Sequence, residues 1–414
     1  MQTTTYAWPG DSLLTDYIDE ALSQSPEISG GQAMVDVERA RGRMASAWMN
    51  PELMLGIMDV PADFATGSDP MVQKQIGVMQ RLPWPGKLSV SKRASAERVA
   101  GAEADLEAIR WGVRTMVAMS YFDLAGLLAQ KEVLERALAL AEEQLRVTRI
   151  AVSSAMESQA NIHAARLERN TIERQLTKLD SDIATAEAAL AASVGRWGTA
   201  GLTRPALLPQ VTPLPPVDLE EALADAPTLK VLRHDSLAAA LDLKRAGLSY
   251  FPDVHVGARY SFRGKMLEEM PGAAGSSQWM DQEDRVSLEV TFSIPLWARG
   301  NQKAEIMERR AMAAKSSEDV AQRRIDLVAQ ARTAYAEAQS DARQFEITRD
   351  SMIADAESAF RSAMLEYQAG RVSWMNLNHS RMRLTMLHMD LAMIAADFNV
   401  KRAALEGLLG AVLR

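Results

Sequence analysis

Residues 254–263 read VHVGARYSFR, and every second residue from Val254 to Phe262 is apolar or aromatic. The stretch at 285–294, RVSLEVTFSI, repeats the alternation but starts from a polar residue. A strict period of two predicts two β-strands, each with one apolar and one polar face. Each run is about 10 residues long, which is the length at which a tilted strand crosses a bilayer.

Such a strand pair fits two architectures. In a membrane barrel, the apolar face meets lipid and the polar face lines a water-filled lumen. In a soluble antiparallel sheet, the apolar face is buried against a core. In the barrel interpretation, the lumen residues that keep the channel wet are Arg259, Arg263, Arg285 and Glu289.

Aromatic residues at the ends of the strand-like runs favour the barrel. The start of the first strand and the end of the second strand lie on the same side of a hairpin, so rings placed there would form one girdle. Such girdles mark the membrane interface in barrels. The predicted membrane-interface aromatics are Trp48, Trp84, Tyr250, Phe251 and Trp297.

A second hairpin is expected at about 52–82, with a loop at 61–70. Its pattern is less clean. The apolar face comprises Leu53, Leu55, Ile57, Val72, Ile76 and Val78, and the pattern is blurred by Met54, Met58, Lys74 and Met79. Four strands are too few to close a barrel, because about eight is the smallest practical number. The barrel must therefore be shared between copies, and three copies would give 12 strands.

The chain is internally duplicated. ALSQSPEI at 21–28 aligns with ALADAPTL at 222–229, and each half has a helical stretch, two strand-like runs and two long helical stretches. The predicted repeats are 1–195, with its hairpin at about 52–82 and helix pair at 86–195, and 218–414, with its hairpin at about 253–295 and helix pair at 300–410. Residues 196–217 hold five of the chain's 16 prolines, which predicts an extended linker.

Four proline-free stretches, 86–152, 157–195, 300–367 and 373–410, predict long helices. At ~1.5 Å per residue, the first of each pair would be about 100 Å long, which implies a coiled-coil-like or tubular assembly. The predicted fold class is mainly α with a small β part. Long antiparallel helices form a helical tunnel, and four strands per chain contribute to a shared 12-stranded trimeric barrel.

Composition excludes several functions. With 46 Lys+Arg against 54 Asp+Glu, the net charge is −8, so no basic footprint for nucleic acid exists. The chain has no Cys, and its five His show no ligand spacing. Neither a phosphate-binding loop nor a nucleophile elbow occurs. We therefore expect no enzyme activity, no catalytic residue, no metal site and no cofactor, and we find no apolar run that predicts a spanning helix.

The segment YQAGRVSWMNL at 367–377, taken with the duplication and the proline-bounded hairpins, resembles the TolC-like outer membrane efflux proteins. The resemblance covers essentially the whole chain. Within that family, LPWPGK at 82–87 is similar to members that serve heavy-metal resistance-nodulation-division pumps.

The resemblance implies a homotrimer whose barrel sits in outer membrane lipid and whose helical tunnel extends into the periplasm. It implies a passive exit duct in a tripartite efflux system. A periplasmic adaptor (membrane fusion protein) and an inner-membrane resistance-nodulation-division pump would deliver the solutes, with metal ions such as copper or silver among them. The adaptor-docking tips would include Glu157, Gln159, Gly370, Arg371, Ser373 and Trp374.

One departure from the family concerns the lumen constriction. Many relatives carry Asp six and nine residues after the tip glycine, and those positions here are Asn376 and His379. A ring of aspartates attracts cations. An amide and an imidazole in their place put cation selectivity at this aperture in doubt.

Methionine is abundant, with 23 in the chain, and a group of five lies beside His379 and His388, at Met375, Met382, Met386, Met389 and Met393. Thioethers suit Cu(I), but methionine also fills irregular gaps between helices. The spacing of these residues mainly indicates a core stripe.

A soluble antiparallel coiled-coil scaffold is the alternative from another class. The start, MQTTTY, lacks a basic and an apolar signal region, so either the chain is cytosolic or its signal peptide is not part of this sequence. The scaffold leaves the alternating strands and their aromatic ends unexplained. The expected location is therefore the bacterial outer membrane, extending into the periplasm.

Overall fold

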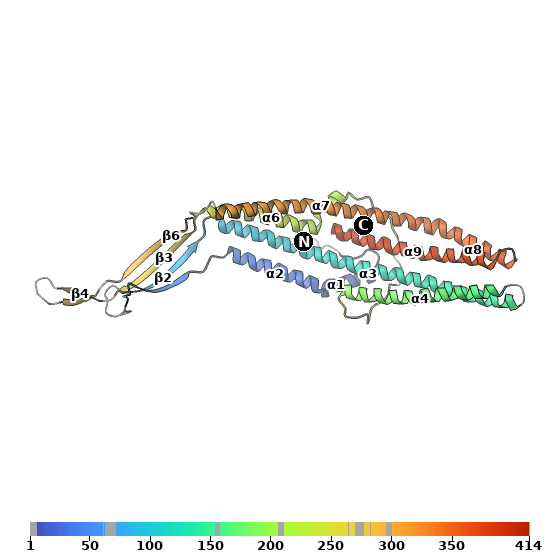
Figure 1. Cartoon of the computed structure of the whole chain (residues 1–414). Coiled ribbons are helices and arrows are strands. Elements are labelled where there is room, and N and C mark those ends of the chain that lie inside the picture. The colour runs from blue at the N-terminus through green and yellow to red at the C-terminus, as the bar shows by residue number, and fades with distance from the viewer. Residues whose placement is uncertain are drawn as a thin grey trace. The chain divides into compact units, whose positions relative to one another are not determined.

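The computed structural model describes residues 6–60, 62, 72–153, 158–205, 211–263, 265–269, 277–281, 283–294 and 300–413. The first half of the chain forms α1 (Ser12–Gln24), α2 (Pro26–Ser46), β1 (Glu52–Met58), β2 (Gln73–Leu82), α3 (Lys87–Ser153) and α4 (Gln159–Val194). The second half forms α5 (Leu219–Ala222), η1 (Leu223–Asp225), α6 (Pro227–Gly247), η2 (Leu248–Tyr250), β3 (Val254–Arg263), β4 (Lys265–Glu269), β5 (Ser277–Asp281), β6 (Arg285–Phe292), α7 (Asn301–Ile347), η3 (Thr348–Met352), α8 (Ile353–Gln368) and α9 (Trp374–Leu409). The same order of helices, strands and two long helical stretches thus occurs twice, which confirms the predicted mainly α, duplicated fold (Figure 1).

The chain divides into two compact units, each built from both halves of the sequence. The first comprises Met1–Met34, Glu103–Val231 and Ala321–Arg414, and the second comprises Val35–Ala102 and Leu232–Val320.

The second unit carries a four-stranded antiparallel sheet in the order β1-β2-β3-β6. The two predicted hairpins lie next to each other because β2 pairs with β3, with Val78 opposite Ala258. The stretch 264–283, expected to be a loop, contains the two-stranded ladder β4-β5. Pairing within this long connection satisfies backbone groups that an open loop would leave to water.

The first unit is helical, and its main core joins side chains of α1, α3, α4 and α9. α8 and α9 form an antiparallel pair (Figure 1). α3 and α9 approach closely where Gly126 faces Ala396, since a Cβ added at Gly126 would lie 2.6 Å from that of Ala396. None of the described helices is both long and apolar enough to cross a membrane.

A buried charge cluster lies within this unit. Arg114 Nη2 donates to Glu406 Oε2 at 2.7 Å, and both side chains are fully buried. Arg402 Nε donates to the other oxygen of Glu406 at 3.1 Å. Arg114 also lies over the rings of Trp8 and Trp111. Burial lowers the pKa of Arg114, and the Glu406 carboxylate opposes that shift. Breaking one member of such a pair leaves an uncompensated buried charge.

The helix expected over 300–367 is divided by one π-helical turn, η3. Buried positions before it, Ala331, Ala338 and Ala342, follow helical spacing, whereas the step from Thr348 to Ile353 is five residues. A π-turn accommodates one extra residue per turn. It therefore keeps the buried faces of α7 and α8 in phase.

The predicted linker at 196–217 has no helix or strand in its described parts. It is held to helices of the same unit by tyrosines. The Tyr17 hydroxyl donates to the Thr203 carbonyl at 2.8 Å, and the Tyr335 hydroxyl donates to the Pro215 carbonyl at 3.0 Å.

Candidate functional site

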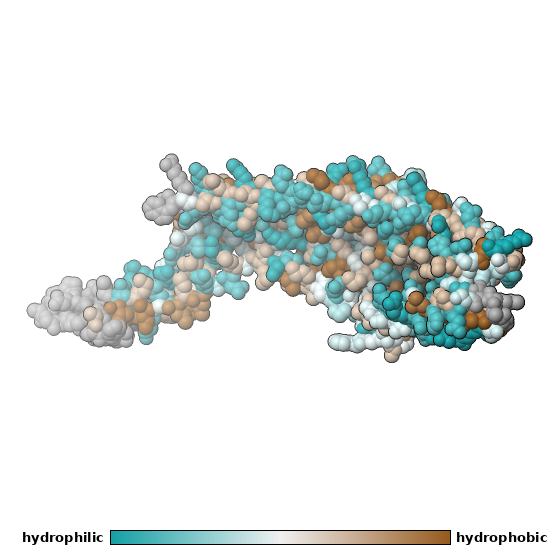
Figure 2. Space-filling view, turned by 45° about the vertical axis from the view of Figure 1, so that its right-hand side comes forward, coloured by the Kyte–Doolittle hydropathy of each residue, from teal (hydrophilic) through white to brown (hydrophobic). Residues whose placement is uncertain are grey.

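One face of the four-stranded sheet is apolar and exposed. Across the sheet, Leu53 pairs with Val78, Val78 with Ala258 and Ala258 with Leu288, so that apolar residues stand side by side. Leu288 is 82% exposed and Leu55 71% exposed. Other large residues of this exposed face are Leu53, Ile57, Ile76, Val78, Val256, Tyr260, Phe262, Val286, Val290 and Phe292. The strand region of Figure 2 shows brown, hydrophobic patches accordingly.

The register also explains the blurred pattern of the first hairpin. Met54 pairs with Gly77 and Met79 pairs with Gly257, so both methionines lie on the opposite, polar face of the sheet. Lys74 lies on the apolar face but at the end of β2, opposite Ile57 of β1.

The polar face brings two of the predicted lumen residues together. Arg259 Nη2 lies 3.0 Å from Glu289 Oε2. Arg263 is the last residue of β3, and its backbone N–H donates to Asp284 Oδ1 at 3.1 Å. Arg285 is exposed and pairs in register with Ser261. The structure of one chain gives these residues a common face, and their place in a lumen stays a prediction.

The connection from the sheet to α3 is tied by Asp253, which the sequence analysis did not single out. Its carboxylate accepts hydrogen bonds from Arg81 Nη2 and Lys87 Nζ, both at 2.8 Å, and from the Trp84 N–H at 3.1 Å. Burial raises the pKa of Asp253, but the hydrogen bonds from Lys87, Arg81 and Trp84 outweigh it and lower the pKa to about 2. The LPWPGK segment therefore has a structural role here.

The predicted interface aromatics are partly brought together in the same unit. Trp84 stacks on Phe251 with ring centroids 5.1 Å apart. Tyr250 and Trp48 are exposed, at 43% and 63%. Trp297 lies outside the described residues.

The tip between α8 and α9 is a tight turn. Gly370 has φ +70°, a conformation that favours glycine. Ser373 caps α9 by accepting from the Asn376 N–H at 3.4 Å. Gly370, Arg371 and Ser373 are exposed, as is Gln159 at the start of α4. Glu157 lies outside the described residues.

Trp374 differs from the other predicted tip residues because it is only 4% exposed. It packs with Leu145 of α3 and Ala165 of α4, beside the partly buried Tyr367. A large indole on the inner side of the first turn of α9 fills the space between the helix pairs. We therefore leave Trp374 out of the proposed docking surface.

Asn376 and His379 are exposed and lie one turn apart on α9. The opposite side of this helix faces the core through Leu377, Asn378 and Arg381. The two predicted constriction residues therefore share a free face in the single chain, and their place at a constriction stays a prediction.

Arg381 is a buried charge that links α9 to α4. Its Nη2 lies 3.1 Å from Glu168 Oε1 and 2.7 Å from Asn378 Oδ1. Burial lowers the pKa of this guanidinium, and the Glu168 carboxylate opposes the shift. The sequence carries a signal for this position, because Arg381 stands four residues after Leu377 and so lies on the same side of α9 as that apolar residue.

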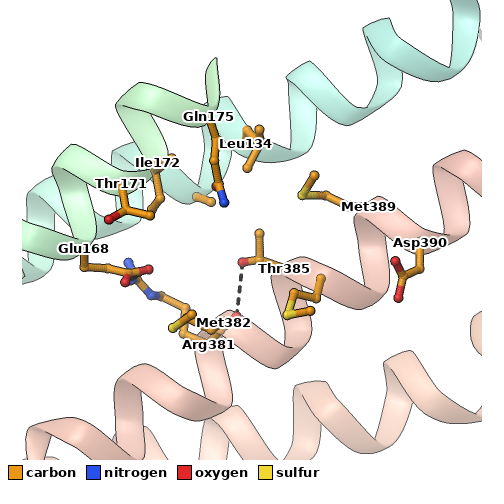
Figure 3. A pocket seen from close by; sticks show the side chains of 12 residues that line it. Leu134, Glu168, Thr171, Ile172, Gln175, Arg381, Met382, Thr385, Met389 and Asp390 are labelled. Atoms are coloured by element: carbon orange, nitrogen blue, oxygen red, sulfur yellow. Dashed lines mark hydrogen bonds and ion pairs between the residues drawn. The ribbon is translucent and has the colours of Figure 1, made fainter. Parts of the chain in front are cut away.

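Beside this ion pair lies a cavity of about 260 Å³ between α3, α4 and α9. Glu168, Thr171, Ile172 and Gln175 project from α4 toward Thr385 and Met389 of α9 (Figure 3). No group of three His, Asp or Glu side chains in the described part of the chain converges to hold a metal ion.

A duplicated helical chain whose sheet exposes an apolar face has the architecture of the TolC-like channel-tunnel class. The chain belongs to the outer membrane efflux protein family, whose sequence profile matches residues 17–196 and 219–411. A search of curated proteins gives no match.

Solved structures of similar fold include the outer membrane protein VceC from Vibrio cholerae, with 19% identity over 98% of this chain and 97% of that chain and a TM-score of 0.81. CusC, described in connection with folding and transmembrane channel formation, is 18% identical over 99% and 95% of the two chains, with a TM-score of 0.82. The open state of the MtrE outer membrane channel from Neisseria gonorrhoeae is 16% identical over 100% and 95%, with a TM-score of 0.77.

Proposed function

We propose that the chain is the outer membrane channel of a tripartite efflux system and acts as a passive exit duct. The observation that carries this proposal is the exposed apolar face of the sheet. Burying apolar area contributes roughly 25 cal/mol per Å², so residues as open as Leu288 and Leu55 require a lipid or protein cover. Lipid fits best, because the apolar residues form continuous rows across four strands.

The sheet also supports a shared barrel. Within the described chain, β1 and β6 each pair on one side only and leave two free edges. Unpaired edges are a template for pairing with another chain. Three copies joined edge to edge would close a 12-stranded barrel, with Arg259, Arg263, Arg285 and Glu289 toward its lumen.

Partners are proposed from the exposed helix ends. A periplasmic adaptor would dock on Gln159, Gly370, Arg371 and Ser373, together with Glu157. An inner-membrane pump of the resistance-nodulation-division type would supply the energy and the selectivity, while Asn376 and His379 would line the periplasmic constriction. The family is one of efflux channels, not enzymes, and we propose that the chain itself catalyses no reaction.

The alternative, a soluble coiled-coil scaffold, accounts for the helices but requires another cover for the apolar sheet face. Two measurements separate the proposals. The purified protein should need detergent to stay dispersed and should conduct ions when added to a planar lipid bilayer. A protein that stays dispersed without detergent and gives no conductance would support the scaffold instead.

Export itself is tested in cells that contain the adaptor and the pump but lack this chain. Restoring the wild-type chain should lower dye accumulation. A variant with Arg371→Glu and Gln159→Glu at the tips should insert and conduct normally but fail to restore export. The control is Arg310→Glu, an exposed position on α7 away from the tips, which should restore export fully.

A further inference from the structure

Six side chains with soft or borderline donor atoms recur along α9 at intervals of three or four residues. They are Met375, His379, Met382, Met386, Met389 and Met393, which we call the Met ladder. The spacing of these methionines mainly predicts a core stripe. The structure corrects this, because Met375 is 71%, Met386 60%, Met393 47% and Met382 41% exposed.

The core side of α9 is occupied by other residues. Leu377, Leu387, Ala395 and Phe398 are buried at 8% exposure or less. Met389 is the only member of the ladder that packs, as a partly buried residue, against the main core. Gap filling in the core therefore does not explain the ladder as a whole.

The spacing places successive donors within reach of one ion. Side chains three and four residues apart on a helix have Cβ atoms about 5–6 Å from each other. Methionine has three rotatable side-chain bonds, so that two neighbouring thioethers can turn toward a common point. The ladder continues over five such steps.

Three members of the ladder, Met382, Met386 and Met389, line the same cavity beside α4. Figure 3 shows Met382 and Met389 on either side of Thr385 along α9, with Asp390 next to Met389. Asp390 and Glu168 supply two carboxylates to this lining, and Glu168 already pairs with Arg381. Asp390 thus adds negative charge to a cavity lined by thioethers.

This donor set selects a class of ion. Thioethers bind Cu(I) well and hard cations such as Mg²⁺ and Ca²⁺ poorly, and imidazole also suits copper. Ag(I) shares the charge and softness of Cu(I). The charge of Asp390 offsets that of a monovalent cation.

We propose that the Met ladder binds soft monovalent cations, Cu(I) or Ag(I), with its strongest site at Met382, Met386 and Met389. The inference deepens the proposed function by naming a class of solute that the channel handles. It rests on that function only for the direction of transport, since binding itself needs no partner.

The test is a calorimetric titration, in which silver nitrate is added to the purified full-length protein in detergent and a chloride-free buffer. The triple variant Met382→Leu/Met386→Leu/Met389→Leu keeps the apolar volume and removes the sulfur atoms. The control triple Met44→Leu/Met307→Leu/Met312→Leu changes three exposed methionines outside the ladder. We expect saturable binding that the ladder variant weakens at least tenfold, because even outer-shell changes at metal sites cost about 10–100-fold in affinity.

Equal silver binding by the ladder and control variants, or no saturable binding by the wild type, would overturn the proposal. X-ray absorption of the silver-loaded protein provides an independent measurement. It should show sulfur neighbours that the ladder variant loses, and a shell of nitrogen and oxygen alone would contradict the ladder. If the chain binds silver but does not conduct ions, the proposed channel function is wrong and the Met ladder proposal is supported. If the chain conducts ions but does not bind silver, the Met ladder proposal is wrong and the channel function is supported.

Discussion

Asp253 shows how single residues secure the transition from strand to helix. Its carboxylate accepts hydrogen bonds from the side chains of Arg81 and Lys87 and from one backbone N–H, and only 9% of the residue is exposed. Its pKa is about 2 in the folded chain and about 3.9 in an unfolded one. A depressed folded pKa means that the stabilisation is complete above the unfolded value and is lost as the pH falls toward the folded value.

This difference predicts a pH dependence between pH 4 and pH 2. Above about pH 5, Asp253→Asn should lower the free energy of unfolding by about 2 kcal/mol. The deficit relative to wild type should shrink as the pH approaches 2, because the wild-type carboxylate becomes protonated. Heat unfolding followed by circular dichroism in detergent measures this difference. Asp319→Asn, in an exposed pair with Lys315, is the control, and an Asp253→Asn deficit that stays constant with pH would contradict the assignment.

Two glycines provide a matched test of close packing at the residue scale. A Cβ at Gly407 of α9 would overlap the Thr115 side chain of α3, whereas a Cβ at Gly112 of α3 meets nothing within 4 Å. Gly407→Ala should therefore destabilise the protein by about 1–3 kcal/mol, as overpacking does. Gly112→Ala should be neutral or stabilising by up to about 1 kcal/mol through helix propensity. Denaturant unfolding in detergent checks both variants, and the same effect at both sites would rule out the close contact.

Among the elements, β3 and β6 follow directly from the sequence because their side chains alternate strictly, whereas the alternation in β1 and β2 is less clean. The helix bounds follow equally well, since glycine or proline marks several of their ends and none of the long stretches contains proline. The π-turn at Thr348–Met352 could not be predicted, because it depends on which residues meet the core. The pairing of β4 with β5 could not be predicted, because the sequences of these two strands show no clear alternation of polar and apolar residues.

The candidate site was predicted less completely than the fold. The faces of the sheet follow from periodicity, whereas the tip residues were expected from the family resemblance. The burial of Trp374, the side-chain partners of the Asp253 carboxylate and the pairing of Arg381 with Glu168 depend on contacts between segments more than 160 residues apart. Methionine spacing alone could not separate a core stripe from an exposed ladder, because both repeat every three or four residues.

The sheet itself predicts an asymmetry between its faces. Leu288→Arg places a charge on the apolar face and should cost roughly 2–4 kcal/mol if it lies near the bilayer midplane. Ser287→Arg is adjacent, exposed and on the polar face, so it should be tolerated. The measurement is the fraction of protein that folds into lipid vesicles at a series of urea concentrations. Similar losses for the two variants would argue against a lipid-facing surface.

For the whole molecule, we propose that other copies of the chain close the free edges of the sheet. Family membership and the similar fold of solved channels support a membrane channel. The single chain supplies four strands and two open edges in its described part. A closed barrel of three chains requires β1 of one copy to pair with β6 of the next.

Cysteine cross-linking tests this pairing most directly, because the chain has no Cys of its own. One cysteine is placed on β1, at Leu53, Leu55 or Ile57, and one on β6, at Val286, Leu288 or Val290. All nine combinations are oxidised in outer membranes and separated on denaturing gels. If three chains share one barrel, at least one combination should give covalent dimers and trimers and nothing larger. Products that stay at one chain in every combination, or that extend beyond three chains, would contradict the shared barrel.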